Sequence, residues 1–147
     1  MVLFYHSGRF SDRLGNGGSF LLFYSMLTGE GGLIMPFLMI RTAKEWIKLP
    51  LDQVYDITSH PDKAHYVRIK TAGKSYDVLD SLSRLEKEYS PVLVRCHRNC
   101  LVNLSKIREI DVEKRALILE SNRPIAFSRR RYQELRQLWL NKGEEIR

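Results

Sequence analysis

Short apolar and β-prone runs, separated by turn residues, make up most of the chain after about residue 41. This pattern is typical of short β-strands. The runs follow one another too closely for the crossover helices of a parallel sheet, so antiparallel pairing is expected. The pattern predicts strands at residues 46–49, 54–58, 66–71, 74–78, 92–96, 101–102, 107–112, 116–119 and 124–127.

Two segments have apolar residues at helical spacing instead. The first begins after a cap at Asp80 or Ser81 and ends before Pro91. Its apolar residues are Leu79, Leu82, Leu85 and Tyr89. The second closes the chain after a cap at Ser128, and its apolar face is made of Tyr132, Leu135, Leu138 and Trp139. We therefore predict a mostly β fold of short antiparallel strands with one short internal helix and a C-terminal helix.

The first forty residues differ in composition from the rest. They hold two apolar runs, 19–27 and 33–40, around a Gly-rich segment. Neither run reaches the roughly 20 apolar residues of a membrane-spanning helix. We expect a hydrophobic, Gly-rich, poorly ordered extension over residues 1–41, a folded domain over 42–142 and a tail over 143–147. No stable membrane association is expected, and the alternative is a membrane-associated interaction module that uses residues 19–40.

Composition narrows the class of protein. Hydrophobic residues make up 44% and charged residues 28% of the 147 residues, enough for a packed core. Two cysteines exclude a disulfide-built secreted scaffold and suit a reducing compartment, which predicts a cytoplasmic protein. The net charge of +7 arises from 24 Lys and Arg against 17 Asp and Glu, and all of the excess follows residue 40. Such an excess suggests a polyanionic partner.

The C-terminal helix begins with three consecutive cations, Arg129, Arg130 and Arg131. A helix N-terminus carries about half a positive charge, so each cation in its first turn costs a few tenths of a kcal/mol. This placement makes sense where a phosphate backbone supplies anions to the arginines and to the free N–H groups of the first turn. The alternative is a solvated basic face.

A second candidate segment is Arg95-Cys-His-Arg-Asn-Cys-Leu-Val-Asn103. His97, Arg98 and Asn99 at its centre are side chains that contact base edges and phosphates. A metal site would use Cys96, His97 and Cys100. Their spacing lacks the paired cysteine knuckles of zinc sites, so no metal and no cofactor is expected.

A third candidate is the polar loop over residues 59–65, which contains Lys63 and two histidines, His60 and His65. A metal pair, a base-contacting loop and an ordinary surface loop all stay open here. No nucleophile elbow, HExxH motif, P-loop or GxGxxG motif occurs in the sequence, so we expect no enzyme. A metal-dependent nuclease that uses His97 is the alternative.

The motif Arg95–Asn103, followed by Ile107 and by Ile125-Ala-Phe-Ser-Arg-Arg130, resembles the LytTR family of bacterial DNA-binding domains. The resemblance extends from about Lys44 to Trp139. Val94 stands where the family often has an aromatic residue, and Asn99 where serine is usual.

The resemblance implies a mostly β fold whose loops enter successive major grooves of promoter direct repeats, in a sequence-specific transcriptional regulator. By motif, His65, Arg98 and Arg130 match the family's DNA contacts, with Arg129 beside them. His97, Asn103 and Ser128 would support the loops. A homodimer on DNA, and competition or contact with other LytTR regulators, are further expectations. Residues 1–40 are too few for a receiver domain of about a hundred residues, so we expect a stand-alone LytTR domain.

Overall fold

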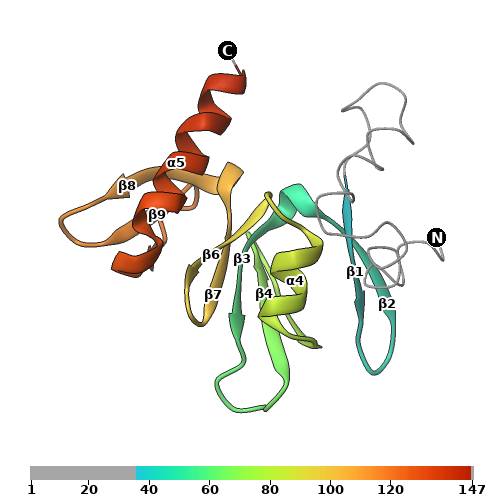
Figure 1. The fold of residues 1–147 in the computed structure, drawn as a ribbon. Helices are drawn as coiled ribbons and strands as arrows, with labels where there is room; N and C mark the ends of the chain where they lie inside the picture. Colours follow the sequence, from blue (N-terminus) through green and yellow to red (C-terminus); the bar gives the residue numbers. More distant parts are fainter. Residues whose placement is uncertain (1–35, 147) are drawn as a thin grey trace.

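The computed structural model describes residues 36–146, with side chains described as far as residue 141. In this part of the chain the strands form three antiparallel sheets (Figure 1). The strands are β1 Phe37–Arg41, β2 Trp46–Pro50, β3 Val54–Ser59, β4 Tyr66–Thr71, β5 Ser75–Leu79, β6 Leu93–His97, β7 Cys100–Asn103, β8 Ile107–Asp111, β9 Ala116–Leu119 and β10 Pro124–Ala126. The helices are α4 Leu82–Glu88 and α5 Arg129–Ile146, with short 3₁₀ turns η1 Leu51–Gln53 and η2 Leu104–Lys106. The predicted fold class is confirmed.

The largest sheet has five strands in the order β5-β4-β3-β7-β6. The expected hairpin of β4 and β5 is present, with Lys70 opposite Ser75. The backbone N–H of Thr71 closes its turn by donating to the carbonyl of Lys74 at 2.9 Å. Strands β8, β9 and β10 form a separate three-stranded sheet. Antiparallel pairing brings the turns between consecutive strands to the ends of each sheet, where functional loops can gather.

Strand β1 corrects the predicted N-terminal boundary. Residues 37–41, assigned to the extension, pair with β2 in a regular hairpin. Leu38 and Ile40 lie 1% and 0% exposed in the core, because their side chains point to the same face of the strand. The folded unit therefore includes these residues. The apolar run 19–27 lies outside the described residues, and no helix within residues 36–146 is long and apolar enough to cross a membrane.

Two further sequence expectations concern the helices. The hydroxyl of Ser81 caps α4 by accepting the backbone N–H of Arg84 at 3.1 Å. Leu79, expected on the apolar face of this helix, is the last residue of β5 and is 66% exposed, so that expectation is wrong. At the other end of the chain, α5 extends to Ile146, which places residues 143–146 in the helix rather than in a separate tail.

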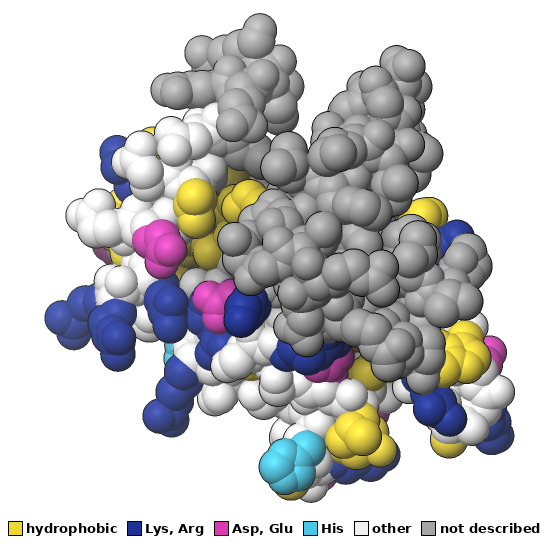
Figure 2. Space-filling view, turned by 45° about the vertical axis from the view of Figure 1, so that its right-hand side comes forward, with side chains coloured by type: hydrophobic (Ala, Val, Ile, Leu, Met, Phe, Trp, Pro, Cys, Tyr) yellow, Lys and Arg dark blue, Asp and Glu magenta, His cyan; other side chains and the backbone are white. Residues whose placement is uncertain are grey.

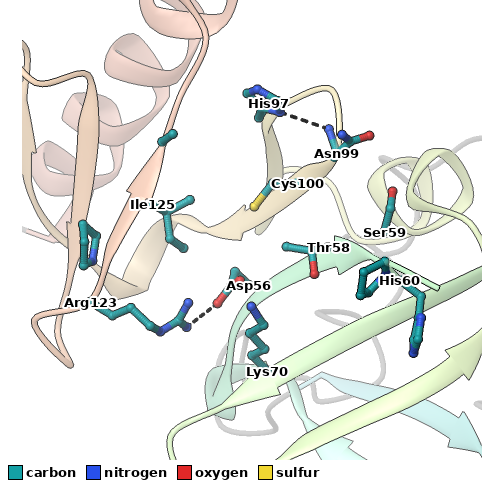
Figure 3. A pocket seen from close by; sticks show the side chains of 13 residues that line it. Asp56, Thr58, Ser59, His60, Lys70, His97, Asn99, Cys100, Arg123 and Ile125 are labelled. Carbon is teal, nitrogen blue, oxygen red and sulfur yellow. Dashed lines mark hydrogen bonds and ion pairs between the residues drawn. The ribbon is translucent and has the colours of Figure 1, made fainter.

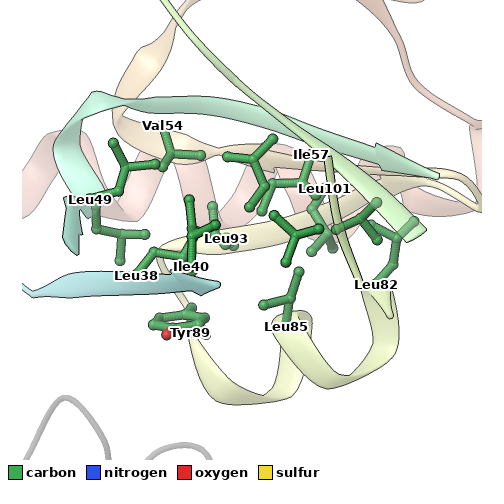
Figure 4. Packing of buried hydrophobic residues seen from close by; sticks show 14 residues of the cluster. Leu38, Ile40, Leu49, Val54, Ile57, Leu82, Leu85, Tyr89, Leu93 and Leu101 are labelled. Carbon is green, nitrogen blue, oxygen red and sulfur yellow. The ribbon is translucent and has the colours of Figure 1, made fainter. Parts of the chain in front are cut away.

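The five-stranded sheet separates two hydrophobic clusters. The first lies between the sheet, the β1–β2 hairpin and α4 (Figure 4). The second lies on the opposite face, under η2, β8–β10 and α5. Strand β7 serves both, because Leu101 joins the first cluster while Cys100 and Val102 join the second. The face of α5 that enters the second cluster carries the predicted residues Tyr132, Leu135, Leu138 and Trp139.

Replacing Ile40 by alanine is expected to lower the free energy of unfolding by about 2–5 kcal/mol, since it removes a fully buried side chain from the first cluster. Urea unfolding followed by circular dichroism measures the loss. Lys44→Ala, at an exposed position of the β1–β2 turn, is the control and should change stability by less than about 0.5 kcal/mol. An Ile40→Ala variant as stable as the parent would mean that β1 is not part of the folded unit.

Candidate nucleic-acid interface

The loop between β3 and β4 is held by a network of hydrogen bonds at its base. The backbone N–H of His60 donates to the carbonyl of Tyr66 at 3.0 Å, and the backbone N–H of Tyr66 donates to the carbonyl of Lys63 at 3.3 Å. His65 has a positive φ of 68°, and its carbonyl accepts the N–H of Asp80 at 3.1 Å. The side chains of Lys63 and His65 are exposed at the loop tip. The Lys63 amine lies 5.1 Å from the centre of the Tyr66 ring.

The turn between β6 and β7 presents Arg98 and Asn99, both exposed. The Nδ1 atom of His97 accepts the backbone N–H of Asn99 at 3.3 Å. The Arg95 guanidinium, on β6, donates to the Arg98 carbonyl at 2.8 Å and forms an ion pair with Glu86 of α4 at 3.1 Å. The turn is thus tied to the sheet on one side and to α4 on the other.

The third element is the start of α5, where Arg129 and Arg130 are exposed and Arg131 is half-buried. Ser128 fixes this start through its backbone: its N–H donates to the Cys96 carbonyl at 2.9 Å, and its carbonyl accepts the Arg131 N–H at 3.1 Å. The rings of Phe127 and Tyr132 stack on either side of the junction, 5.5 Å between centres.

Two backbone hydrogen bonds join these three elements into one edge. The N–H of Ser59, at the start of the β3–β4 loop, donates to the Asn99 carbonyl in the β6–β7 turn at 3.1 Å. The bond from Ser128 to Cys96 then connects the same hairpin to α5. The loop, the turn and the helix start follow one another along the lower left of Figure 1. In Figure 2, Lys and Arg side chains gather at the lower left and a histidine lies at the lower end.

The arginines of this edge differ in their partners from five arginines elsewhere in the described residues. Among residues 36–141, the guanidinium groups of Arg98, Arg129 and Arg130 form no ion pair with a carboxylate. Five other arginines do, in the pairs Arg68–Asp77, Arg84–Asp80, Arg95–Glu86, Arg108–Glu109 and Arg123–Asp56. The edge therefore offers positive charge that the described residues do not neutralise.

A groove of about 460 Å³ lies behind this edge, between the five-stranded sheet and β10 (Figure 3). Arg123 crosses it to form an ion pair with Asp56 of β3, which is only 1% exposed. Lys70, opposite Asp56 on β4, and Cys100 of β7 also line the groove. The Arg123–Asp56 ion pair links the β9–β10 turn to the five-stranded sheet, so it helps to fix the position of the three-stranded sheet relative to the larger one.

The residues that a metal site would use do not gather. No group of three or more His, Cys, Asp or Glu side chains in the described part of the chain could hold a metal ion. Cys96 and Cys100 are both free and buried. A hydrogen bond with Cys96, and burial, raise the pKa of the Cys100 thiol far above its ordinary value, so this thiol keeps its proton. His60 and His65 lie on the same loop, but the His60 ring is buried in contact with Asp77 while His65 is exposed.

Asn103 does not lie at the edge where the resemblance expected it to act. It is fully buried at the far end of β7 from Arg98. Its side-chain N–H₂ donates to the carbonyls of Leu51 and Val54 at 3.1 and 2.8 Å. Its Oδ1 accepts from Ser105. Asn103 therefore fastens η1, β3 and η2 together and does not support the loops.

Sequence reasoning passed over three features of this edge. His60 and Arg95 each hold a loop at its base, and each also contacts a carboxylate on another element, Asp77 of β5 and Glu86 of α4 respectively. The third feature is the β8–β9 turn with exposed Lys114 and Arg115, whose Arg115 carbonyl accepts the Phe127 N–H at 3.1 Å just before α5. The unusual charge of the Glu113-Lys-Arg115 turn was a signal, but only the fold brings it beside the helix start.

Comparisons with known proteins point to one family. The profile of the LytTr DNA-binding domain family matches residues 44–140. A solved LytTr DNA-binding domain of a protein from Bacillus cereus superposes with a TM-score of 0.57 at 21% sequence identity. That match covers 70% of this chain and 95% of the other. A comparison with the curated proteins gives no match.

The ion pair under the β3–β4 loop predicts a pH-dependent contribution to stability. Hydrogen bonds from Arg68 lower the pKa of Asp77, so its charged form is favoured in the folded state. This contribution is present above the ordinary carboxyl pKa and is lost as the pH falls through the lowered one. Because Asp77 is a third exposed, Asp77→Asn is expected to cost about 1 kcal/mol or less at pH 7.

Urea unfolding of both proteins at several pH values tests this, with Glu113→Gln on an exposed turn as the control for the loss of one carboxylate. The difference between the parent and Asp77→Asn should shrink below about pH 4. A difference that grows on acidification would contradict the assignment.

Proposed function

The chain belongs to the LytTr DNA-binding domain family, and we propose that it is a sequence-specific transcription regulator that inserts its basic edge into successive major grooves of promoter direct repeats. As a member of this family it is a DNA-binding transcription regulator. The proposal adds the mode of binding, the residues and the kind of site. It also includes a non-enzymatic role and a cytoplasmic location.

The proposal is carried by two backbone hydrogen bonds, from Ser59 to Asn99 and from Ser128 to Cys96. They align the β3–β4 loop, the β6–β7 turn and the start of α5 along one edge. A rigid edge with three separate projections suits a duplex whose grooves return at regular intervals. The major groove is about 12 Å wide and displays a distinct donor and acceptor pattern for each base pair. Loops fixed on a sheet can enter it without the long recognition helix of other DNA-binding folds.

The exposed side chains divide into two expected roles. His65, Arg98 and Arg130 would contact base edges, since a guanidinium forms two parallel hydrogen bonds with guanine and an imidazole can donate or accept. Lys63, Asn99, Arg129 and Arg131 would bind phosphates or flanking positions, helped by the free N–H groups at the start of α5. His97 and Ser128 would keep the turn and the helix start in place.

Direct repeats are a further part of the proposal. One edge of this size covers a limited stretch of duplex, so two copies bound in the same orientation would contact two repeats. A homodimer formed on DNA, or a mixed arrangement with another LytTR regulator at the same promoter, would then set the outcome at the promoter. Both are part of the proposal.

Arg98→Ala and Arg130→Ala should each weaken binding to the preferred duplex by about 1–3 kcal/mol, or roughly 5- to 150-fold, with little change on a scrambled duplex. The preferred duplex is selected from a random-sequence pool with the parent chain, and affinity is measured by fluorescence anisotropy. Arg136→Ala removes the same charge from an exposed position further along α5 and is the matched control. An equal loss on both duplexes would reassign the arginine to the phosphate backbone.

Salt separates the phosphate contacts from the base contacts. Affinity for both duplexes should fall linearly with the logarithm of the salt concentration, because bound cations release counterions from DNA. Arg129→Ala should weaken binding to both duplexes alike and reduce this slope by about 1. Selection that enriches no sequence, together with equal affinity for all duplexes, would overturn the proposal of specific recognition.

A further inference from the structure

We propose that His60 is a positioning residue for DNA binding, whose imidazole shapes the loop that presents Lys63 and His65. This inference rests on the proposed function and deepens it. It assigns to a histidine whose side chain is only 4% exposed the task of fixing the residues proposed to contact DNA.

The Nδ1 atom of His60 lies at the centre of the β3–β4 loop. It accepts the backbone N–H of Asp62 at 3.0 Å and that of Lys63 at 2.9 Å. Asparagine and aspartate often hold a turn in this way, by accepting the N–H two residues further on. Here a histidine ring takes that role and fixes the backbone of Lys63 directly.

The opposite ring nitrogen decides whether Nδ1 is free to accept. His60 Nε2 lies 3.2 Å from the Asp77 carboxylate, which is acceptor-only when ionised. Arg68 donates hydrogen bonds of 2.8 and 3.3 Å to this carboxylate. These bonds lower the pKa of Asp77, so the carboxylate stays ionised. Arg68 Nη2, which can only donate, also lies 3.2 Å from Nε2. Nδ1 accepts two backbone N–H groups and so carries no proton. In the neutral ring the proton therefore belongs on Nε2, where it is donated to Asp77, and Nδ1 keeps its lone pair for the loop.

Burial of the His60 ring restricts its movement and so keeps both ring nitrogens beside their partners. The His60 side chain is 4% exposed, and its ring meets the Tyr66 ring edge-on at 6.4 Å. Residues 61–65 are exposed and have no hydrophobic anchor of their own. Without the Nδ1 acceptor, the N–H groups of Asp62 and Lys63 lose their partner in the protein. The loop would then have to be ordered during binding, at the expense of affinity.

Three substitutions separate the acceptor from the bulk of the ring. The side-chain oxygen of His60→Asn lies at the same distance along the side chain as Nδ1 and can accept both N–H groups. His60→Gln reaches the position of Nε2 and can donate to Asp77, but offers no acceptor at the Nδ1 position. His60→Ala removes both. If His60 positions the loop, His60→Asn binds the preferred duplex within about twofold of the parent, while His60→Gln and His60→Ala lose roughly tenfold.

Two readouts distinguish positioning from loss of packing. Amide hydrogen exchange reports directly on Asp62 and Lys63, which should exchange slowly in the parent and His60→Asn and faster in the other two variants. Urea unfolding gives the stability of each variant. Since glutamine fills more of the ring's space than asparagine, His60→Gln is expected to be at least as stable as His60→Asn, which is the reverse of the order in binding.

The outcomes are distinct. Binding that follows stability, with His60→Asn no better than His60→Gln, overturns the inference, as does unchanged exchange at Asp62 and Lys63 in His60→Ala. If Arg98→Ala and Arg130→Ala leave specific binding intact, the proposed function fails instead, while the exchange experiment still reports whether His60 orders the loop.

Discussion

The burial of the β6–β7 hairpin on both faces is the constraint on which the rest of the structure depends. Leu101 faces one hydrophobic cluster, while Cys100 and Val102 face the other, so the hairpin cannot tilt without opening a cavity in one of them. Its turn is therefore a fixed point at the end of the sheet. The β3–β4 loop bonds to that turn at Asn99, and the start of α5 bonds to the same hairpin at Cys96. The packing of the two hydrophobic clusters therefore determines how the loop, the turn and the helix start of the candidate interface are arranged.

The arginines of the body and those of the candidate interface differ in how their charge is balanced. Within the described body, arginines such as Arg68 and Arg123 are neutralised by carboxylates that are themselves partly or fully buried. At the edge, Arg129 and Arg130 lie in the first turn of a helix, where the helix dipole opposes them. A domain that gained nothing from this arrangement would be more stable with acidic residues there. The unfavourable placement is therefore best explained by a partner that brings its own negative charge.

The sequence predicted the strands and helices well because their signals are local. Turn residues separate β-prone runs after residue 45, and the apolar face of α5 repeats at helical spacing. Strand β1 was missed because it ends a longer, nearly continuous apolar run interrupted by Pro36, which gives no alternation. Leu79 was misassigned for a related reason, since one apolar residue at the right spacing does not distinguish the end of a strand from the start of a helix.

The exposed candidates and their supports differ in how visible they are in sequence. Arg98 and Arg130 stand in a recognisable motif, and their exposure follows from turn and helix-start positions. The function of His60 depends on Asp77, seventeen residues away along the chain and on another strand. A polar loop containing a histidine gives no local sign that the ring is buried. The β6–β7 turn is likewise held by Arg95, which pairs with Glu86 of α4. Loops ordered before DNA arrives lose less conformational entropy on binding, so in the proposed mode of binding these supports would contribute to affinity without touching the duplex.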